Sequence, residues 1–261
     1  MQYTAQAKVN IFLKIVGTRD RYHELVSRFM TVPSLFDTLS FVPKKAHEAF
    51  ELSGNFNCTL EHNTLYRTFE VLKAHGFSRD VDYVMNENAL HVIKNIPTGA
   101  GLGGGSSDSA TFLKMLNDTA CLGLSVEEMM QLGSEVGADV PFFVSGFESA
   151  NVSGIGEVVE KFDEHALDIE VFTPSLACNT TLVYQTYRKY FLQTMNQALA
   201  SRMAVSKSSE LLTYFSKEEL NDLLPACLKA YPKLAIYAKE GWFFSGSGSS
   251  FFRLTQKVKN G

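Results

Sequence analysis

The first stretch of the chain alternates strictly between two faces over residues 3–15. This period of two predicts an antiparallel strand with one buried and one solvent-facing side. Lys8 and Asn10 project side by side from the more polar of the two faces. The apolar face carries Tyr3, Ala5, Ala7, Val9, Ile11, Leu13 and Ile15, and the other face carries Gln6, Lys8, Asn10, Phe12 and Lys14.

Strand-like and helix-like patterns then follow each other without a regular order. A turn at residues 17–20 separates the first strand from the next. Further strands are predicted at 25–29, 37–42, 81–85, 90–96, 158–159, 169–172, 241–244 and 250–254. Apolar spacings of three and four predict helices at 63–75, 107–116, 125–136, 182–198, 217–224 and 228–239. This intermingling favours the α+β class, and a boundary near residue 155 predicts two domains, 1–155 and 156–261.

A glycine-rich run lies between a predicted strand and a predicted helix. It reads Pro97, Thr98, Gly99, Ala100, Gly101, Leu102, Gly103, Gly104, Gly105, Ser106 and Ser107. Glycine leaves backbone N–H groups unshielded and permits left-handed conformations. A helix start carries partial positive charge and free amide donors, so the run predicts a loop that holds phosphate groups.

Three other interpretations of this loop are weaker. Gly99, Gly101 and Gly104 have the spacing of a dinucleotide fingerprint, but no second strand with a terminal acid follows the helix. No Gly-Lys-Ser/Thr closes the run, so it is not a Walker A loop. A flexible linker is rarely placed between a strand and a helix with an apolar face.

Composition narrows the class of protein. The chain has 261 residues, 45% of them hydrophobic and 20% charged, as in a soluble globular protein. Its net charge of −4 argues against nucleic-acid binding, and no apolar stretch is long enough for a membrane span. The start of the sequence has no secretory pattern, and the four cysteines are scattered, so we expect a cytoplasmic protein.

Two charged side chains are candidates for catalysis. Lys8 lies in an otherwise apolar strand, and Asp139 lies in a turn before Val140 and Pro141. Asp139 could simply be a turn or capping residue, and Lys8 a solvated charge. Phosphoryl transfer to an alcohol, however, needs a carboxylate at the hydroxyl proton and a cation near the transferred group. With a phosphate loop in the same chain, a Lys8–Asp139 pair would supply both.

Two further motifs could border the same site. Tyr22 and His23 follow the first turn, and a second glycine run spans residues 245–249. Either could be ordinary packing or an ordinary hairpin loop. The run could also place a second cluster of N–H groups opposite the first. The histidines lack the spacing of zinc ligands, so we expect no metal held by the protein alone.

These motifs together resemble those of the GHMP kinases, in order and over nearly the whole chain. Residues 7–13 are similar to the first motif of that superfamily, residues 97–107 to its ATP-phosphate loop, and residues 245–250 to its third motif. Residues 22–25, 137–143 and 154–157 are most similar to the members that act on a cytidine-diphosphate-linked methylerythritol. The resemblance implies an N-terminal nucleotide-binding lobe and a C-terminal ferredoxin-like lobe.

The same resemblance implies a reaction and a set of site residues. Mg–ATP would be the co-substrate, with no tightly bound cofactor, and the acceptor would be the 2-hydroxyl of the methylerythritol unit. Lys8 and Asp139 would be the catalytic pair, and Asn63 and Lys94 would approach the adenosine. The substrate contacts implied are Asn10, Tyr22, His23, Phe29, Thr180 and Tyr184, with Tyr22 and Tyr184 stacking on the cytosine and His23 hydrogen-bonding it.

One residue departs from the family pattern. Arg21 stands where the family usually has glycine before Tyr22 and His23. Arginine does not readily adopt a positive φ, so this turn is expected to differ. A homoserine- or mevalonate-type kinase is an alternative, but such substrates have no base to stack on Tyr22. A nucleotide-binding module without catalysis is another, although Lys8 and Asp139 are both present.

Overall fold

The computed structural model describes residues 2–20, 22–45 and 48–255 of the chain, and they form two compact units. One unit comprises Met1–Ala7, Pro33–Thr98 and Gly103–Phe147. The other comprises Lys8–Val32, Gly99–Leu102 and Glu148–Gly261. The units are interleaved in sequence because β1 (Gln2–Arg19) and β2 (Tyr22–Pro43) run through both of them. The predicted domain limits, 1–155 and 156–261, stay a prediction.

In the first unit, the C-terminal half of β2 is the centre of a small sheet. It pairs antiparallel with β4 (Asn88–Ile93), from Thr38 opposite Ile93 to Pro43 opposite Asn88. A short parallel strand, β3 (Leu52–Gly54), extends the sheet on the other side of β4. These pairings place the end of β4, and hence the start of the glycine loop, next to β2.

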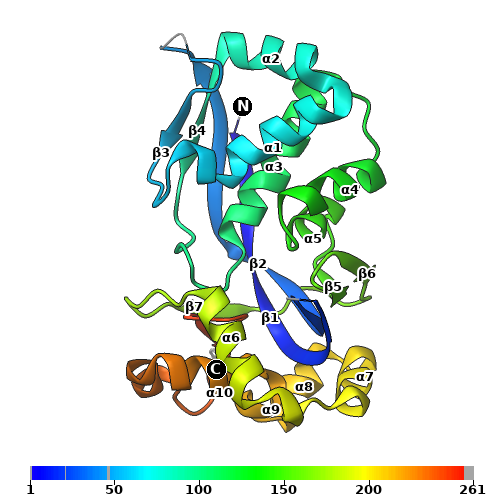
Figure 1. Cartoon of the computed structure of the whole chain (residues 1–261), viewed down its shortest axis with the longest axis vertical. Coiled ribbons are helices and arrows are strands. Elements are labelled where there is room, and N and C mark those ends of the chain that lie inside the picture. Colours follow the sequence, from blue (N-terminus) through cyan, green and yellow to red (C-terminus); the bar gives the residue numbers. More distant parts are fainter. Residues whose placement is uncertain (1, 21, 46–47, 256–261) are drawn as a thin grey trace, which may run out of the picture. The chain divides into compact units, whose positions relative to one another are not determined.

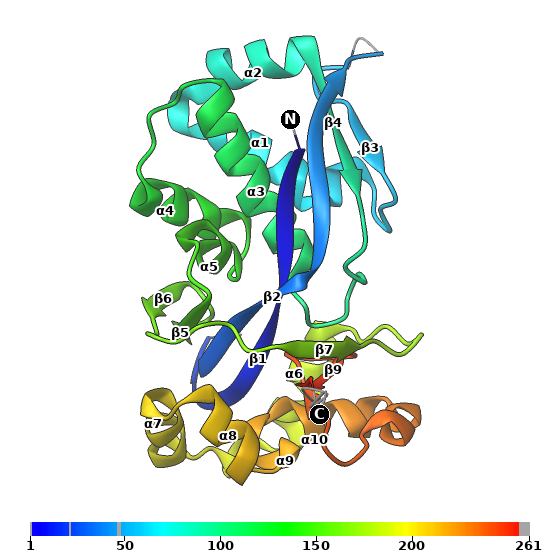
Figure 2. The same cartoon turned by 180° about the vertical axis from the view of Figure 1, so that it is seen from behind.

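Five helices of the first unit gather on one side of these strands, as Figures 1 and 2 show from opposite directions. They are α1 (Thr64–Leu72), α2 (Ser78–Glu87), α3 (Gly104–Thr119), α4 (Val126–Val136) and α5 (Val140–Ser145). Leu39 and Leu90 of the strands pack in one core with Phe69 of α1 and Phe112 of α3. Burial of these apolar side chains stabilises the layer that carries the glycine loop.

Two of these helices differ from the sequence-based prediction. Residues 81–85 were expected to be a strand, but they lie in α2, where Val81, Val84 and Met85 are buried together. Their spacing of three and one is that of one helical face. Helix α5 was not predicted because Pro141 was taken as a chain exit. Proline is tolerated in the first turn of a helix, where its missing N–H has no partner to lose.

In the second unit, the N-terminal half of β2 pairs with a different strand. It runs antiparallel to β5 (Ser149–Gly154), with Leu25 opposite Gly154, and β5 pairs with β6 (Val158–Lys161). A separate antiparallel sheet has the order β7 (Ile169–Phe172), β9 (Phe251–Leu254), β8 (Phe243–Phe244). The turn and strand predicted around residues 153–159 and the aromatic strands near 243 and 252 are confirmed.

The helices of the second unit are shorter than the sequence suggested. They are α6 (Thr180–Tyr190), α7 (Gln197–Val205), α8 (Ser208–Tyr214), α9 (Lys217–Leu220) and α10 (Leu223–Ala230). The helix predicted over 182–198 breaks after Tyr190, and α7 starts afresh with the Asn196 side chain accepting the Leu199 amide. The helix predicted over 228–239 ends at Ala230, ahead of Pro232.

The first strand is confirmed, but its polar face is not exposed to solvent. Every residue from 7 to 15 is buried, including Lys8, Asn10, Phe12 and Lys14. The prediction of a half-buried strand was therefore wrong for this part of β1. C-terminal segments of the same unit cover the second face, since Asn10 contacts Ser245 and Lys14 contacts Asp222. The expected α+β class is confirmed.

Candidate active site

The glycine loop has the backbone that its sequence predicts. Gly99, Gly101 and Gly103 adopt φ values of 65°, 76° and 71°, a region that side chains disfavour. Helix α3 begins at Gly104, three residues earlier than predicted, with Gly103 as its N-cap. Gly103 has no side chain to cap the first-turn amides, which leaves them available to an anion.

The second glycine run packs against the first within the second unit. A Cβ on Gly101 would lie 2.3 Å from the carbonyl oxygen of Ser245, so only glycine can occupy this position without a shift. The Ser245 hydroxyl donates to the Gly101 carbonyl at 3.0 Å, and the Ser250 amide donates to that of Ala100 at 3.1 Å. The two glycine runs were expected to face each other, and these bonds place them together.

The Lys8 strand is attached to the same loop. The Lys8 amide donates to the Leu102 carbonyl at 3.0 Å, and the Asn10 amide donates to the Ser245 hydroxyl at 3.2 Å. The Lys8 ammonium donates to Asn10 Oδ1 at 2.7 Å and lies 4.2 Å from the centre of the Phe29 ring. This cation–π contact and hydrogen bond hold a buried positive charge beside the loop. Lys8 and Asn10, which were expected side by side, therefore form one cluster with Phe29.

Asp139 lies at the start of α5, in the first unit. Its backbone, with φ −83° and ψ −11°, precedes a helix of six residues that includes Pro141. Asp139 is the N-cap residue of this helix, although its side chain makes no capping hydrogen bond to it. Its role, whether in catalysis or as a turn or capping residue, stays a prediction. Because Lys8 belongs to the second unit, the convergence of Lys8 and Asp139 stays a prediction.

The two residues assigned to the adenosine side already have structural partners. Asn63 is buried and caps α1 by accepting the Leu65 amide at 2.9 Å. Lys94, at the end of β4, donates to Asp37 on β2 and to Asp108 on α3, the latter at 2.6 Å. The approach of Asn63 and Lys94 to adenosine stays a prediction.

This buried ionic cluster of Asp37, Lys94 and Asp108 was not foreseen. Burial lowers the pKa of Lys94, but the two carboxylates outweigh it and hold that pKa above its usual value. Burial and the nearby Asp37 raise the pKa of Asp108 to about 7, against the opposing effect of Lys94. Asp37 also accepts the amides of Asn95 and Ile96 at 2.5 and 2.8 Å, so it fixes the chain where it enters the loop.

Some of the residues predicted to bind the base lie around one histidine of the second unit. The His23 ring centre is 5.2 Å from that of Tyr184 and 6.0 Å from that of Tyr187. The Thr180 and Ser247 hydroxyls are 2.8 Å apart, which links α6 to the second glycine run. The Tyr22 side chain is 47% exposed.

His23 carries an unused polar atom. Its Nε2 is buried and makes no hydrogen bond to any described residue. Burial, together with the positive charge of Arg188, lowers the pKa of His23. The ring is therefore neutral at pH 7, with one nitrogen as donor and the other as acceptor.

Sequence reasoning missed two residues of this pocket, Tyr187 and Arg188. They lie three and four positions after Tyr184 on α6, so they share a helical face with it. The helical pattern predicted there contained this signal. Arg21, the departure from the family pattern, lies outside the described residues. The neighbouring Asp20 has a φ of 53°, and aspartate tolerates this left-handed region.

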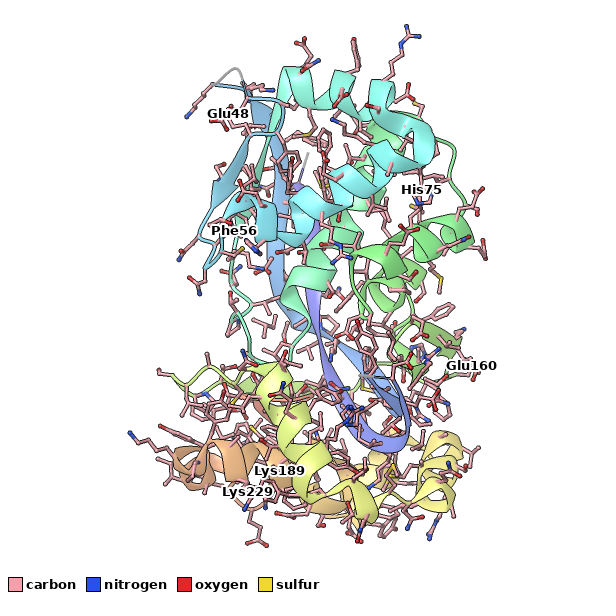
Figure 3. All side chains as sticks on the ribbon, in the orientation of Figure 1. Glu48, Phe56, His75, Glu160, Lys189 and Lys229 are labelled. Carbon is pink, nitrogen blue, oxygen red and sulfur yellow. The ribbon has the colours of Figure 1, made fainter. Side chains whose placement is uncertain are left out.

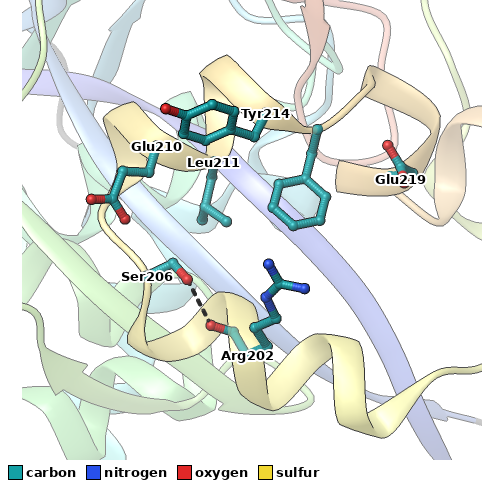
Figure 4. Close-up of a pocket in the computed structure, with 7 residues that line it drawn as sticks. Arg202, Ser206, Glu210, Leu211, Tyr214 and Glu219 are labelled. Atoms are coloured by element: carbon teal, nitrogen blue, oxygen red, sulfur yellow. Dashed lines mark hydrogen bonds between the residues drawn. The ribbon is translucent and has the colours of Figure 1, made fainter.

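A pocket of about 270 Å³ opens elsewhere in the second unit (Figure 4). It contains none of the predicted site residues. The Arg202 guanidinium lies 5.7 Å from the Phe215 ring centre, and the Ser206 hydroxyl donates to the Arg202 carbonyl at 2.9 Å. Its lining residues are Arg202, Ser206, Glu210, Leu211, Tyr214, Phe215 and Glu219.

Within residues 2–20, 22–45 and 48–255, no group of three or more His, Cys, Asp or Glu side chains is placed to hold a metal ion. No helix in the part of the chain that the structure describes is long and apolar enough to cross a membrane.

Residues 63–147 match the family described as the N-terminal domain of GHMP kinases. This segment contains the glycine loop, α3 and Asp139. A fold with these motifs and a helix-start phosphate site is that of an ATP-dependent small-molecule kinase of the GHMP class.

Similar full-length proteins narrow the class further. A 4-diphosphocytidyl-2-C-methyl-D-erythritol kinase of Sulfurimonas denitrificans is 53% identical over 260 residues, covering 98% of this chain and 97% of that protein. A kinase of the same name from a Sulfurovum species is 45% identical over 96% and 97% of the two chains. The crystal structure of a 4-(cytidine 5'-diphospho)-2C-methyl-D-erythritol kinase is 30% identical, with a TM-score of 0.63, over 98% of this chain and 90% of the other.

The chain belongs to the 4-diphosphocytidyl-2-C-methyl-D-erythritol kinase family. It is an ATP-dependent phosphotransferase with the GHMP kinase fold, as the motifs predicted.

Proposed function

We propose that this chain transfers the γ-phosphoryl group of Mg–ATP to the 2-hydroxyl of 4-diphosphocytidyl-2-C-methyl-D-erythritol. The products are the 2-phosphate and ADP, and the reaction is a step of the non-mevalonate isoprenoid pathway. The observation that carries the proposal is the set of bonds that fixes the Lys8 strand and the second glycine run to the phosphate loop. Within the second unit, the buried Lys8 thus lies beside residues 99–102 of the loop.

The loop residues 97–107 would bind the triphosphate, and Mg²⁺ would arrive with ATP. Asp139 would accept the proton of the 2-hydroxyl as its oxygen forms a bond to the γ-phosphorus and the bond to the β-phosphate oxygen breaks. The Lys8 ammonium would offset the charge on the transferred group. Its contact with the Phe29 ring and its hydrogen bond to Asn10 would hold the ammonium in one orientation, and neither partner carries a negative charge that would neutralise it.

The cytosine would bind at the pocket around His23. Tyr22 and Tyr184 would stack on the two faces of the base, and the neutral His23 would bond its edge. Thr180, Asn10 and Phe29 would contact the rest of the substrate. Neither a mevalonate nor a homoserine substrate has a base that would use these rings. We further propose that the enzyme acts in the cytoplasm and needs neither nucleic acid nor a membrane.

The test is ADP release by the purified protein with three acceptors, the cytidine-linked methylerythritol, mevalonate and homoserine. Turnover should occur only with the first. Asp139→Asn should lower kcat at least about 100-fold while ATP still binds, and His23→Ala should raise the KM for the cytidine substrate more than that for ATP. Asp163→Asn, at a fully exposed aspartate, is the control for loss of one negative charge.

Near-normal turnover of Asp139→Asn would remove Asp139 from the catalytic role. ATP binding with no turnover of any acceptor by the natural protein would instead favour a nucleotide-binding module.

A further inference from the structure

The Tyr22–His23 segment is held by a residue from a distant part of the sequence. The Arg188 side chain on α6 donates from the same terminal nitrogen to the carbonyls of Asp20 and Tyr22, each at 3.1 Å. These two carbonyls bracket the position where the family usually has glycine. We propose that Arg188 is a positioning residue for the base pocket, which fixes the turn that presents Tyr22 and His23 to the cytosine. This inference rests on the proposed function.

The geometry gives Arg188 two separate effects on the pocket. A guanidinium nitrogen that bonds two backbone carbonyls restrains both residues more tightly than one contact would. Aspartate tolerates the φ of 53° at Asp20, so this restraint fixes the position of the chain and does not relieve strain. Loosening it would displace Tyr22 directly and His23 through the next peptide.

The second effect is electrostatic and acts on the His23 ring. The titratable and charged groups around that ring are Arg188, Tyr184 and Tyr187 on α6, and Tyr22 and Glu24 beside it on β2. Burial raises the pKa of Tyr187 to about 12, so it stays neutral, and Glu24 lies 3.7 Å from Arg19. Arg188 thus contributes a positive charge that disfavours an imidazolium. A neutral ring can accept a hydrogen bond from the cytosine amino group, whereas an imidazolium can only donate.

The helix supplies a matched control next to Arg188. Lys189, labelled on α6 in Figure 3, is exposed, and its ammonium lies 5.1 Å from the Tyr190 ring centre. Lys189→Met removes the same charge from the same turn of the helix without touching the Asp20 and Tyr22 carbonyls. Arg188→Met removes both carbonyl bonds, and Arg188→Lys keeps the charge and can restore part of them.

The experiment measures KM for both substrates, kcat, and cytidine diphosphate binding by calorimetry. Arg188→Met should raise the KM for the cytidine substrate and the Kd for cytidine diphosphate about 10-fold. The KM for ATP and kcat should stay within about twofold. Arg188→Lys should recover part of the loss, Lys189→Met should match the natural protein, and NMR titration should show a higher His23 pKa in Arg188→Met.

Two results would overturn the inference. One is unchanged cytidine diphosphate binding by Arg188→Met when the natural protein binds it. The other is an equal rise in both KM values for Arg188→Met, which would indicate general damage. If the natural protein binds no cytidine nucleotide at all, the proposed function itself fails, and that outcome is distinct from the other two.

Discussion

Asp37 offers the most direct test of how the phosphate loop is held. Its side chain is fully buried, accepts the amides of Asn95 and Ile96 through one oxygen, and pairs with Lys94 through the other. Asp37→Ala removes all three bonds and leaves two amides without an acceptor. Asp37→Asn keeps the shape and an oxygen for the amides but loses the charge.

The expected loss of stability depends on which buried groups lose their partners in each variant. Removing one partner of a buried ion pair costs about 3–5 kcal/mol, so Asp37→Ala should lower the free energy of unfolding by about that amount. This corresponds to a fall in Tm of roughly 10 °C for a chain of this length. Asp37→Asn should lose only about 1–2 kcal/mol, because Lys94 retains Asp108 and the amides retain an acceptor.

Urea unfolding of the two variants and the natural protein measures these differences, and the KM for ATP reports on the loop. We expect Asp37→Ala to raise that KM, because Pro97 and the glycines directly follow the restrained residues. The reasoning would be refuted if Asp37→Ala lost less than about 1 kcal/mol. Equal losses for Ala and Asn would show that the charge, not the amide bonds, carries the effect.

Two further predictions concern other buried charges. The folded-state pKa of Asp108, about 7, lies above its unfolded value near 4, so the natural protein should lose stability as pH rises through this interval. Urea unfolding at pH 5 to 8 measures the free energy of unfolding of the natural protein and of Asp108→Asn. That of the natural protein should fall, relative to the variant, by up to about 1.4 kcal/mol per pH unit, and a difference that does not change with pH would contradict the prediction. The Arg28 guanidinium is fully buried. It donates to Asn151, Glu164 and the Ala204 carbonyl, and it stacks on the Phe162 ring. Arg28→Met should therefore lower the free energy of unfolding by about 3–5 kcal/mol. Thermal unfolding of Arg28→Met, with Arg202→Met as a control at an exposed arginine, measures this effect. Equal Tm values for the two variants would show that stability does not depend on Arg28.

The local patterns of the sequence predicted the elements that local physics controls. Strict alternation predicted β1, and the glycine run predicted a loop followed by the start of a helix. Predictions failed where two local signals compete. Val81, Val84 and Met85 suit a short strand as well as a helical face, and Pro141 marks a helix start as well as an exit.

The site could be predicted only as far as motifs define it. Lys8 and Asn10 were expected side by side on one strand face, and the structure adds Phe29 to them. Asp37 and Arg188 were missed because each acts on backbone groups far away in sequence, with no motif of its own. Arg188 bonds a carbonyl 168 positions earlier, a separation over which no periodicity or turn chemistry carries information.

The polar face of β1 nevertheless contained a clue to these distant contacts. A buried lysine or asparagine requires partners, because an unpaired polar group in the interior costs free energy. Lys14 donates to the Asp222 carboxylate, whose second oxygen accepts the Ile15 amide at 2.8 Å. The Asn10 side chain donates to the Ser27 hydroxyl at 2.9 Å and accepts from Lys8, and the Asn10 backbone amide donates to the Ser245 hydroxyl at 3.2 Å. The Lys14 side chain and the Asn10 backbone thus have partners in the C-terminal part of the chain. The strand that carries Lys8 therefore takes hydrogen-bond partners from the C-terminal part of the chain.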